Sequence, residues 1–377
     1  MKKIVLVVLL FSMLGTGGFA QSKRDSLKLQ KKMWVSGAGF PFYKPTTSAG
    51  VGGAVLISFQ ADQNDSVSFR SYIPLSLLVS IRGQLALTSG LNLFLNENKM
   101  KLIVDMDVDY GIANYFGTTD NLKAPEIGDT TTHYTQVSFD PEFHLNFRIA
   151  ENLYVGPYLD VTYKYLYDIA PDVYQQMKPL HDKKHQIFNL GIGAGLEYSS
   201  IDNPTFPYRG IQANMRMVYN NELLSSNIGS FGLWFDYRQY VRLFKRRTVL
   251  AWRLNSNNVI GSKENLFLLL PSIEARGLMD GYYYAPSTGV ASIELRHMFA
   301  SNEYYQKGKF WSRFGGTLWA NAGAYGNNLF AWDDFVYSAG LGLRCEVQPY
   351  KNVRFDIGQQ IGGYNKIVFY FGFTEYF

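Results

Sequence analysis

The residues of this chain that could bind a metal are few, and their spacing does not suit one. Asp105, Asp107 and Asp109 offer carboxylate oxygens, which calcium prefers as ligands, but the run lacks the glycine and the distal glutamate of an EF-hand loop. His181 and His185 are four residues apart, a spacing that suits zinc only on a helix, and they lie beside lysines in a long loop. We therefore expect no metal and no cofactor.

The side chains that could catalyse a reaction are not arranged for that work either. The chain has no Gly-x-Ser-x-Gly elbow, no His-Glu-x-x-His pair and no phosphate-binding loop with its lysine. Ser138 and His144 fall on one face of a single expected strand, yet six residues of extended chain span about 20 Å. These two side chains cannot form a catalytic pair, and we expect that the protein is not an enzyme.

The stretch from Gln136 to Ile149 shows the pattern that positions such polar residues. Its even positions carry polar or charged residues and its odd positions carry apolar ones. A period of two indicates a β-strand with chemically opposite faces. The same alternation repeats from end to end, and no apolar run after the first twenty residues is long enough for a membrane helix. The pattern predicts an all-β chain that forms a transmembrane antiparallel β-barrel of about 16 strands, of the outer-membrane type.

Charged residues on the expected strands identify the face that lines the lumen. A lysine or arginine that faces lipid at the middle of a membrane costs roughly 2 to 4 kcal/mol, so the charged face must point inward. The load of 27 Tyr, 27 Phe and 35 Gly also suits a barrel with aromatic girdles. The predicted lumen-lining residues are Asp105, Asp107, Asp109, Asp140, Glu142, Arg148, Asp236, Arg238, Arg242, Arg354 and Asp356.

The gaps between the expected strands orient the barrel. Connections after even-numbered strands are mostly tight, such as 96–99 and 150–152, whereas those after odd-numbered strands include the long ones, of which 256–289 is the longest. Outer-membrane barrels have short periplasmic turns and long outer loops. The sequence therefore predicts a protein of the outer membrane of a diderm bacterium with both termini in the periplasm.

The start of the chain has the features of a secretory signal. Lys2 and Lys3 precede an apolar core, and Gly18-Phe19-Ala20 ends in small residues, which predicts a signal peptide over residues 1–20. Residues 21–33 would form a short periplasmic segment, and residues 34–377 the barrel domain. Without the signal peptide, 34 basic residues face 31 acidic ones, a net charge of about +3, which does not indicate a nucleic-acid partner.

Several short motifs resemble the BamA/TamA family of outer-membrane barrels, also called the bacterial surface antigen family. The segment 274–278, Glu-Ala-Arg-Gly-Leu, is followed by three tyrosines and then by Ser-Ile-Glu-Leu-Arg at 292–296. It is similar to the Val-Arg-Gly-Phe/Tyr motif on the sixth outer loop of that family, and it falls between expected strands 11 and 12. Further similar stretches lie at 206–211, 246–251 and 353–358, so the resemblance covers essentially the whole mature chain.

The resemblance implies a loop that folds into the lumen and is held there by an arginine. By this resemblance Arg276 is the arginine, Glu294 is its glutamate partner on strand 12, and Gly277 lets the loop turn where a side chain would not fit. The chain departs from the family at Asn321, where strand 13 of the family has aspartate, and at the residues that flank Arg276 and Gly277. The alternative is that Arg276 is simply a solvated loop arginine.

The last expected strand, residues 366–377, is rich in aromatic residues. Phe373, Tyr376 and Phe377 resemble the terminal aromatic signal that outer-membrane assembly machinery reads. We expect this strand to close the barrel and to carry that assembly signal.

Two functions from different classes fit these observations. In the first, the protein assists assembly or transfer of proteins or lipids at the outer membrane, with periplasmic or outer-membrane protein partners, since residues 21–33 are too few to form the periplasmic domains of the family's insertases. In the alternative, it is a gated or passive pore for small solutes. Either would contact outer-membrane lipid, and Lys178, Lys183 and Lys184 could meet lipopolysaccharide phosphates. A loop 256–289 inside the barrel would favour the first function.

Overall fold

The computed structural model describes residues 33–44, 48–62, 64–65, 67–114, 133–171, 173, 185–224, 226, 228–244, 247–261, 270–278, 283–299, 310–348, 351–362 and 367–377. The predicted signal peptide and the segment 21–32 lie outside the described residues. So do the loop histidine and lysines from 178 to 184. Met33 is described, and it is the first residue of a strand.

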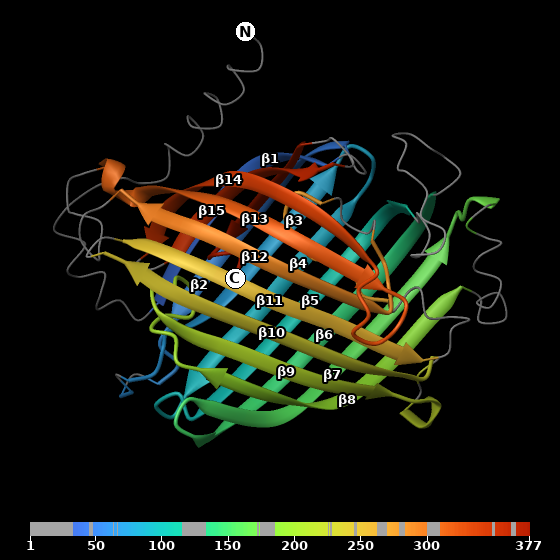
Figure 1. Cartoon of the computed structure of the whole chain (residues 1–377), viewed down its shortest axis with the longest axis horizontal. Coiled ribbons are helices and arrows are strands. Elements are labelled where there is room, and N and C mark those ends of the chain that lie inside the picture. Colours follow the sequence, from blue (N-terminus) through green and yellow to red (C-terminus); the bar gives the residue numbers. More distant parts are fainter. Residues whose placement is uncertain are drawn as a thin grey trace, which may run out of the picture.

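The described chain forms one sheet of sixteen strands in which every strand pairs antiparallel with its neighbours in sequence (Figure 1). The strands are β1 (Met33–Lys44), β2 (Ser48–Phe59), β3 (Ser71–Ser80), β4 (Leu85–Leu95), β5 (Met100–Asn114), β6 (His133–Ala150), β7 (Leu153–Tyr167), β8 (Gln186–Ser199), β9 (Gly210–Asn220), β10 (Ser230–Leu243), β11 (Thr248–Gly261), β12 (Ser287–Met298), β13 (Phe314–Gly326), β14 (Asp334–Gln348), β15 (Lys351–Ile361) and β16 (Ile367–Phe373). Two short 3₁₀ helices, η2 (Glu222–Leu224) and η4 (Phe310–Arg313), lie in connections. The predicted all-β, sixteen-stranded barrel is therefore confirmed. No helix in the described ranges is long and apolar enough to cross a membrane.

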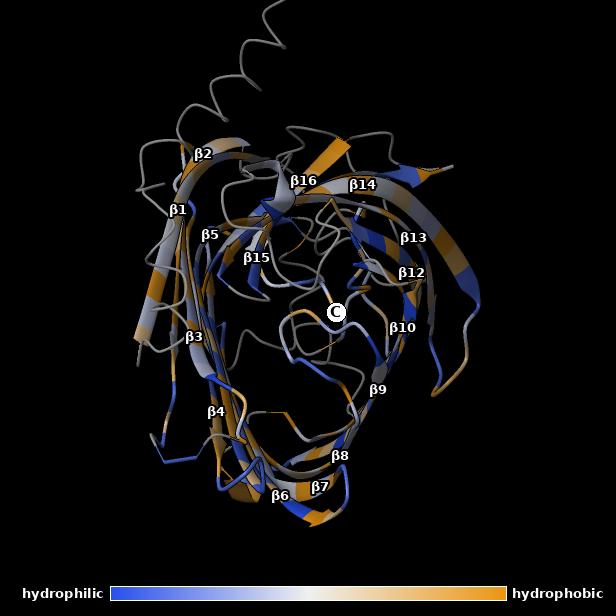
Figure 2. Ribbon diagram, turned by 90° about the vertical axis from the view of Figure 1, so that its left-hand side faces the viewer, coloured by the Kyte–Doolittle hydropathy of each residue, from blue (hydrophilic) through white to orange (hydrophobic). Residues whose placement is uncertain are grey.

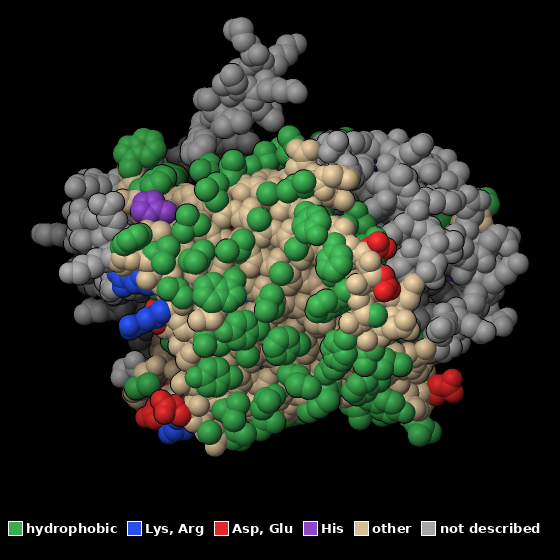
Figure 3. Space-filling model, in the orientation of Figure 1, with side chains coloured by type: hydrophobic (Ala, Val, Ile, Leu, Met, Phe, Trp, Pro, Cys, Tyr) green, Lys and Arg blue, Asp and Glu red, His purple; other side chains and the backbone are tan. Residues whose placement is uncertain are grey.

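The two faces of the wall differ chemically as the alternation predicts. On β6, Phe139, Phe143 and Phe147 are exposed on the outer face. Figure 3 shows hydrophobic side chains over the middle of one outer side of the barrel, with charged side chains near the strand ends. Across β5 and β6, Asp105 lies opposite Glu142 and Asp107 opposite Asp140, which places these carboxylates together on the lumen face.

The rim at which β1 begins is called the first rim here, and the rim at which β1 ends is called the second rim. Tight turns at the first rim include 96–99, where Asn96, Glu97 and Asn98 all have positive φ, and 151–152. The connection 262–286 at the second rim is the longest of the chain. However, connections 60–70 and 200–209 at the first rim are not tight. The predicted difference in connection length between the two rims therefore holds for most connections but not for all of them.

Strands β11 and β12 extend further toward the second rim than the sequence pattern predicts. Ser256, Asn257 and Asn258 continue the ladder and pair with Gly289, Thr288 and Ser287. These polar residues interrupt the alternation, which is why the expected strand stopped at 255. They are buried, and Asn258 bonds both Ser256 (2.9 Å) and Ser287 (2.7 Å), so their polar groups are satisfied within the wall.

The meeting of the first and last strands is not a regular ladder. No paired register joins β1 to β16 among the described residues. Instead the ring of Phe371 stacks on that of Phe40, with centroids 3.6 Å apart. Phe40 is on the lumen face of β1, so β16 lies inside β1 rather than edge to edge with it. Gln348, at the end of β14, also reaches β1, where it donates to Ser36 Oγ (2.8 Å). This region is called the seam here.

The end of the chain differs from the expected last strand. β16 stops at Phe373, so the prediction of a strand to residue 377 is wrong. Thr374 has φ of 64° and turns the chain inward, where the carboxylate of Glu375 meets Arg344 (2.8 Å). A charge partner inside the barrel thus decides the path of the last four residues. In Figure 2 the C-terminal end lies within the ring of strands.

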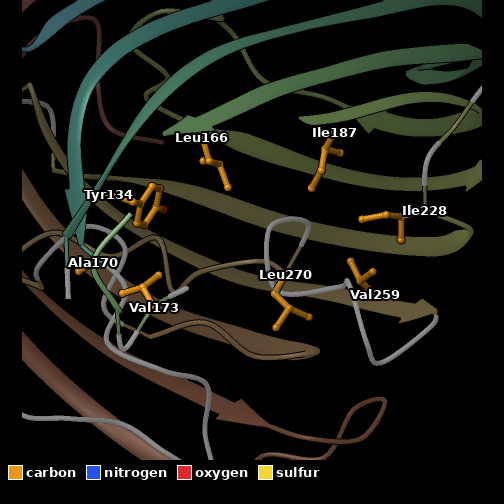
Figure 4. Packing of buried hydrophobic residues seen from close by; sticks show 8 residues of the cluster. All are labelled: Tyr134, Leu166, Ala170, Val173, Ile187, Ile228, Val259 and Leu270. Atoms are coloured by element: carbon orange, nitrogen blue, oxygen red, sulfur yellow. The ribbon is translucent and has the colours of Figure 1, made fainter. Parts of the chain in front are cut away.

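Three buried apolar clusters fill parts of the barrel. Under the connections of the second rim, eight residues including Tyr134, Leu166 and Leu270 pack together (Figure 4). At the first rim, Phe206 and Phe377 belong to a second cluster. The third surrounds the connection between β11 and β12, so the described part of this connection lies inside the barrel.

Candidate functional site in the barrel lumen

Residues Pro271–Leu278, a described stretch of the long connection, pack against the inner wall. Ile273, Ala275 and Leu278 form a buried cluster with wall residues of β12, β13 and β14, among them Val290 and Val336. Apolar burial of this kind stabilises the loop inside the barrel instead of leaving it in water. The segment Pro271–Leu278 is called the plug loop here.

Gly277 allows the closest approach of the plug loop to the wall. Its φ is +86°, and a Cβ at this position would lie 2.8 Å from the Cβ of Ser338 and 3.2 Å from the backbone of Gln359. Its N–H donates to the hydroxyl of Tyr370 on β16 (2.9 Å). Only glycine combines this backbone conformation with this contact.

Arg276 is fully buried and is paired, not solvated. Its Nη2 donates to the carboxylate of Glu294 on β12, and its Nη1 donates to Oδ2 of Asp356 on β15 (3.0 Å). Burial alone lowers the pKa of this guanidinium, but the charges of Glu294 and Asp356 outweigh burial and raise the pKa above its ordinary value. Arg276 is therefore charged, and its charge is shared between two strands of the wall.

Two aromatic rings lie against the Arg276 guanidinium. Its Cζ lies 4.5 Å from the ring centroid of Trp319 and 4.5 Å from that of Tyr376. The indole of Trp319 lies across the β14 and β15 backbones, where Cβ atoms at Gly340 and Gly358 would come within 2.2 Å and 2.1 Å of it. Two glycines thus make room for the ring on which the guanidinium stacks.

Asn321 takes a different role from the aspartate that the resemblance places there. Its Nδ2 donates to the backbone oxygen of Arg276 (2.9 Å) and to Oγ of Ser338 (3.1 Å). An amide can donate to a carbonyl, whereas a carboxylate cannot. The second carboxylate of Arg276 comes from Asp356 instead, which sequence reasoning identified only as a lumen-lining residue.

Two further buried arginines join this pair into a network. Arg344 contacts Glu294 (3.2 Å) and Asp356 (2.7 Å), and Arg296 contacts Glu294 (3.1 Å). Arg354 also contacts Asp356 (3.1 Å) and is slightly more exposed. Alternation in β12 and β14 could have placed Arg296 and Arg344 on the lumen face, but nothing in the sequence indicated that they share partners with Arg276.

The predicted assembly-signal residues lie in two different environments. Phe373 is the last residue of β16, whereas Tyr376 and Phe377 are inside the barrel. The hydroxyl of Tyr376 donates to the backbone oxygen of Glu274 in the plug loop (3.0 Å). Arg296 donates to the backbone oxygen of Phe377 (2.6 Å). Sequence reasoning did not place any of these residues against the plug loop.

Four of the remaining predicted lumen residues, Asp105, Glu142, Asp236 and Arg238, line a cavity of about 450 Å³ beside the plug loop. Arg216 pairs with Glu142 (2.9 Å), and Arg253 pairs with Asp236 (2.9 Å). Asp236 also pairs with Arg238. Strand register places Asp109 and Asp140 on the same face, with Arg148 and Arg242 toward the first rim. The cationic members Arg216 and Arg253 were not named from the sequence, although alternation would have found them.

Metal ligands do not gather in this lumen. Among the residues that the structure describes, no group of three or more His, Cys, Asp or Glu side chains could hold a metal ion.

A sixteen-stranded barrel with an apolar outer face and an arginine-anchored plug loop defines a β-barrel protein of the outer membrane. The chain belongs to the Omp85 superfamily, since its residues 49–270 match the Omp85 superfamily domain. The superfamily comprises proteins of outer-membrane protein assembly and transport and is not typically enzymatic. No curated protein sequence matches the chain.

Two solved structures have the same fold. BamA from Haemophilus ducreyi lacking POTRA domains 1–3 has a TM-score of 0.56 at 14% identity, over 91% of this chain and 70% of that one. CdiB from Acinetobacter baumannii has a TM-score of 0.51 at 13% identity, over 91% of this chain and 59% of that one. This chain therefore spans less than two thirds of the CdiB structure. The resemblance to BamA-like barrels expected from the motifs is confirmed.

Proposed function

We propose that this protein assists the assembly or transfer of proteins or lipids at the outer membrane, and that its substrates engage the barrel at the seam. The observation that carries the proposal is the combination of a seam without a β1–β16 ladder and a lumen that holds the plug loop. An unpaired strand edge in the wall offers backbone groups that another chain can pair with.

The geometry of the seam supports this proposal. β1 is twelve residues long, and β2 is its one ladder partner among the described residues. β16 lies on the lumen side of β1, where Phe371 covers Phe40. An apolar cavity of about 240 Å³ remains between β16 and the lumen face of β1–β4. Among the described residues, the last strand thus forms no ladder with the edge of β1.

The contents of the lumen support a pore less well than they support the assembly function. The plug loop and the last residues of the chain fill one side of it, and the cavity beside them is crossed by ion pairs such as Arg216 with Glu142. A passive pore for small solutes is the second candidate, because that cavity is lined by charged side chains. The two functions differ in the conductance that they predict.

Cross-linking at the seam tests the assembly function. A photo-activatable phenylalanine analogue in place of Val35, an outer-face residue of β1, is expected to cross-link to newly exported outer-membrane proteins in cells, because the free edge of β1 would bind their strands. Leu254, which is also exposed on the outer face but lies within the paired wall on β11, is the matched control. Equal cross-linking at both positions, or none at Val35, would contradict the assignment of the seam.

We further propose that residues 1–20 are a signal peptide and that both termini are periplasmic, so the first rim would face the periplasm. The support is the position of the longest connection at the second rim. In a Cys345→Ser background, an impermeant maleimide on intact cells is expected to label Asn328→Cys, an exposed position at the second rim, but not Glu97→Cys, an exposed position at the first rim. The reverse labelling pattern would invert the topology. Periplasmic partners and lipopolysaccharide contacts are part of the same proposal.

A further inference from the structure

The four residues after β16 leave the wall and enter the site that holds the plug loop. Thr374 marks the turn, with φ of 64° and an N–H that donates to the oxygen of Asn352 (2.8 Å). The carboxylate of Glu375 then accepts from Arg344 (2.8 Å) and from the side chain of Asn352 (3.0 Å). Glu375 is buried, so its charge depends on these partners.

The next residue contacts the plug loop directly. The ring of Tyr376 lies against the Arg276 guanidinium, as does the ring of Trp319, and the hydroxyl of Tyr376 donates to the backbone oxygen of Glu274. Tyr376 thus meets the plug loop at a side chain and at a backbone group.

The last residue is held at the first rim. The ring of Phe377 is 4% exposed and packs with Phe206, Tyr240 and Met298. Its backbone oxygen accepts from Arg296, which also contacts Glu294, the partner of Arg276. Wall, plug loop and chain end therefore share one set of buried arginines.

The charges of the last residues and those of the plug-loop anchor depend on each other. Arg276, Arg296, Arg344 and Arg354 face the carboxylates of Glu294, Asp356 and Glu375. Without Glu375, four guanidiniums would share two carboxylates in a site where most of these side chains are almost fully buried. Unpaired buried charge is strongly unfavourable, so departure of the chain end would weaken the network that anchors Arg276.

We propose that Thr374–Phe377 is a latch that fastens the plug loop inside the barrel, so that withdrawal of the latch releases the plug loop. The latch acts on Arg276 in two ways, because Tyr376 covers the guanidinium and Glu375 neutralises the arginines that compete for Glu294 and Asp356. The proposal concerns the conformation of the lumen and does not depend on which substrate the seam binds.

The test measures release of the plug loop at two reporter positions in a Cys345→Ser background. Val336→Cys lies under the plug loop, and Leu56→Cys lies on β2, at a fully buried position outside the clusters that contain residues of the long connection. In purified barrels, Glu375→Gln combined with Tyr376→Ala is expected to raise the rate of maleimide labelling at Val336→Cys by about tenfold or more, because loss of anchoring contacts favours local opening. Labelling at Leu56→Cys is expected to stay unchanged. Glu151→Gln, an exposed carboxylate in a tight turn, is the matched control.

A milder variant keeps the test usable if that double variant does not fold. Tyr376→Phe keeps the ring over Arg276 and removes only the hydroxyl that bonds Glu274, so labelling at Val336→Cys is expected to rise by about two- to tenfold, the effect of one hydrogen bond. Unchanged labelling at Val336→Cys in both variants would overturn the latch. So would an equal rise at both reporters, since that indicates general loosening of the barrel.

Discussion

Glu294→Ala is expected to destabilise the barrel by about 3 to 5 kcal/mol, the usual cost of removing one partner of a buried ion pair. The carboxylate of Glu294 is fully buried and contacts Arg276, Arg296 and Arg344. Its removal leaves Asp356 and Glu375 to balance four guanidiniums, those of Arg276, Arg296, Arg344 and Arg354. The loss should appear as a lower urea midpoint in detergent, with folded barrel followed by its heat-modifiable gel mobility.

A matched substitution separates this effect from the general loss of a lumen carboxylate. Asp105 also faces the lumen and lines the cavity, but it is exposed and forms no ion pair with the described residues. Asp105→Ala is expected to leave the midpoint nearly unchanged. If Glu294→Ala and Asp105→Ala shifted the midpoint equally, the network around Arg276 would not be a stabilising centre.

Arg276→Ala is expected to raise single-channel conductance several-fold in planar bilayers. Arg276 is the plug-loop residue that forms ion pairs with the wall among the described residues. Its removal leaves the loop with its apolar cluster and with hydrogen bonds to Asn321, Ser338, Tyr370 and Tyr376. A loop that moves from the lumen widens the conducting path. The variant should be less destabilised than Glu294→Ala, because Glu294 would keep Arg296 and Arg344.

A control variant and a double variant test whether the effects of Arg276→Ala come from loss of the plug-loop anchor. Arg209→Ala removes an arginine whose side chain is 80% exposed in a connection of the first rim, and it is expected to leave conductance unchanged. In the double variant Arg276→Ala with Glu294→Ala, the loss of stability should be less than the sum of the single losses, since their shared interaction is lost only once. High conductance in the unaltered protein, with no change in Arg276→Ala, would contradict the plug and favour the pore.

The two carboxylate partners of Arg276 can be compared with those that the family resemblance implied. The resemblance implied the Glu294 partner, and the structure contains it. The same resemblance placed an acidic residue where this chain has Asn321. In the structure Asp356 supplies the second carboxylate from β15, and Asn321 binds the loop backbone. The second carboxylate that balances the charge of Arg276 therefore comes from β15 and not from β13.

The sequence by itself determined the wall of this barrel. Alternation with a period of two is a local property, and it assigns each residue of a stretch such as 136–149 to one face. The cost of placing charge in lipid then decides which face points inward. These two facts yield sixteen strands, an all-β barrel and a lumen face that carries Asp105, Glu142 and Asp356, all before any contact across the lumen is known.

Only the tertiary structure decided which side chains meet inside that wall. Arg276 and Asp356 are 80 positions apart, and Glu274 and Tyr376 are 102 apart. Such pairs depend on the curvature of the sheet and on the path of the loops, which no local period encodes. The same holds for the seam and the latch. Residues 366–377 read as one strand because their aromatic residues alternate, yet the chain leaves the wall after Phe373, since a buried carboxylate at Glu375 finds its arginines only inside the closed lumen.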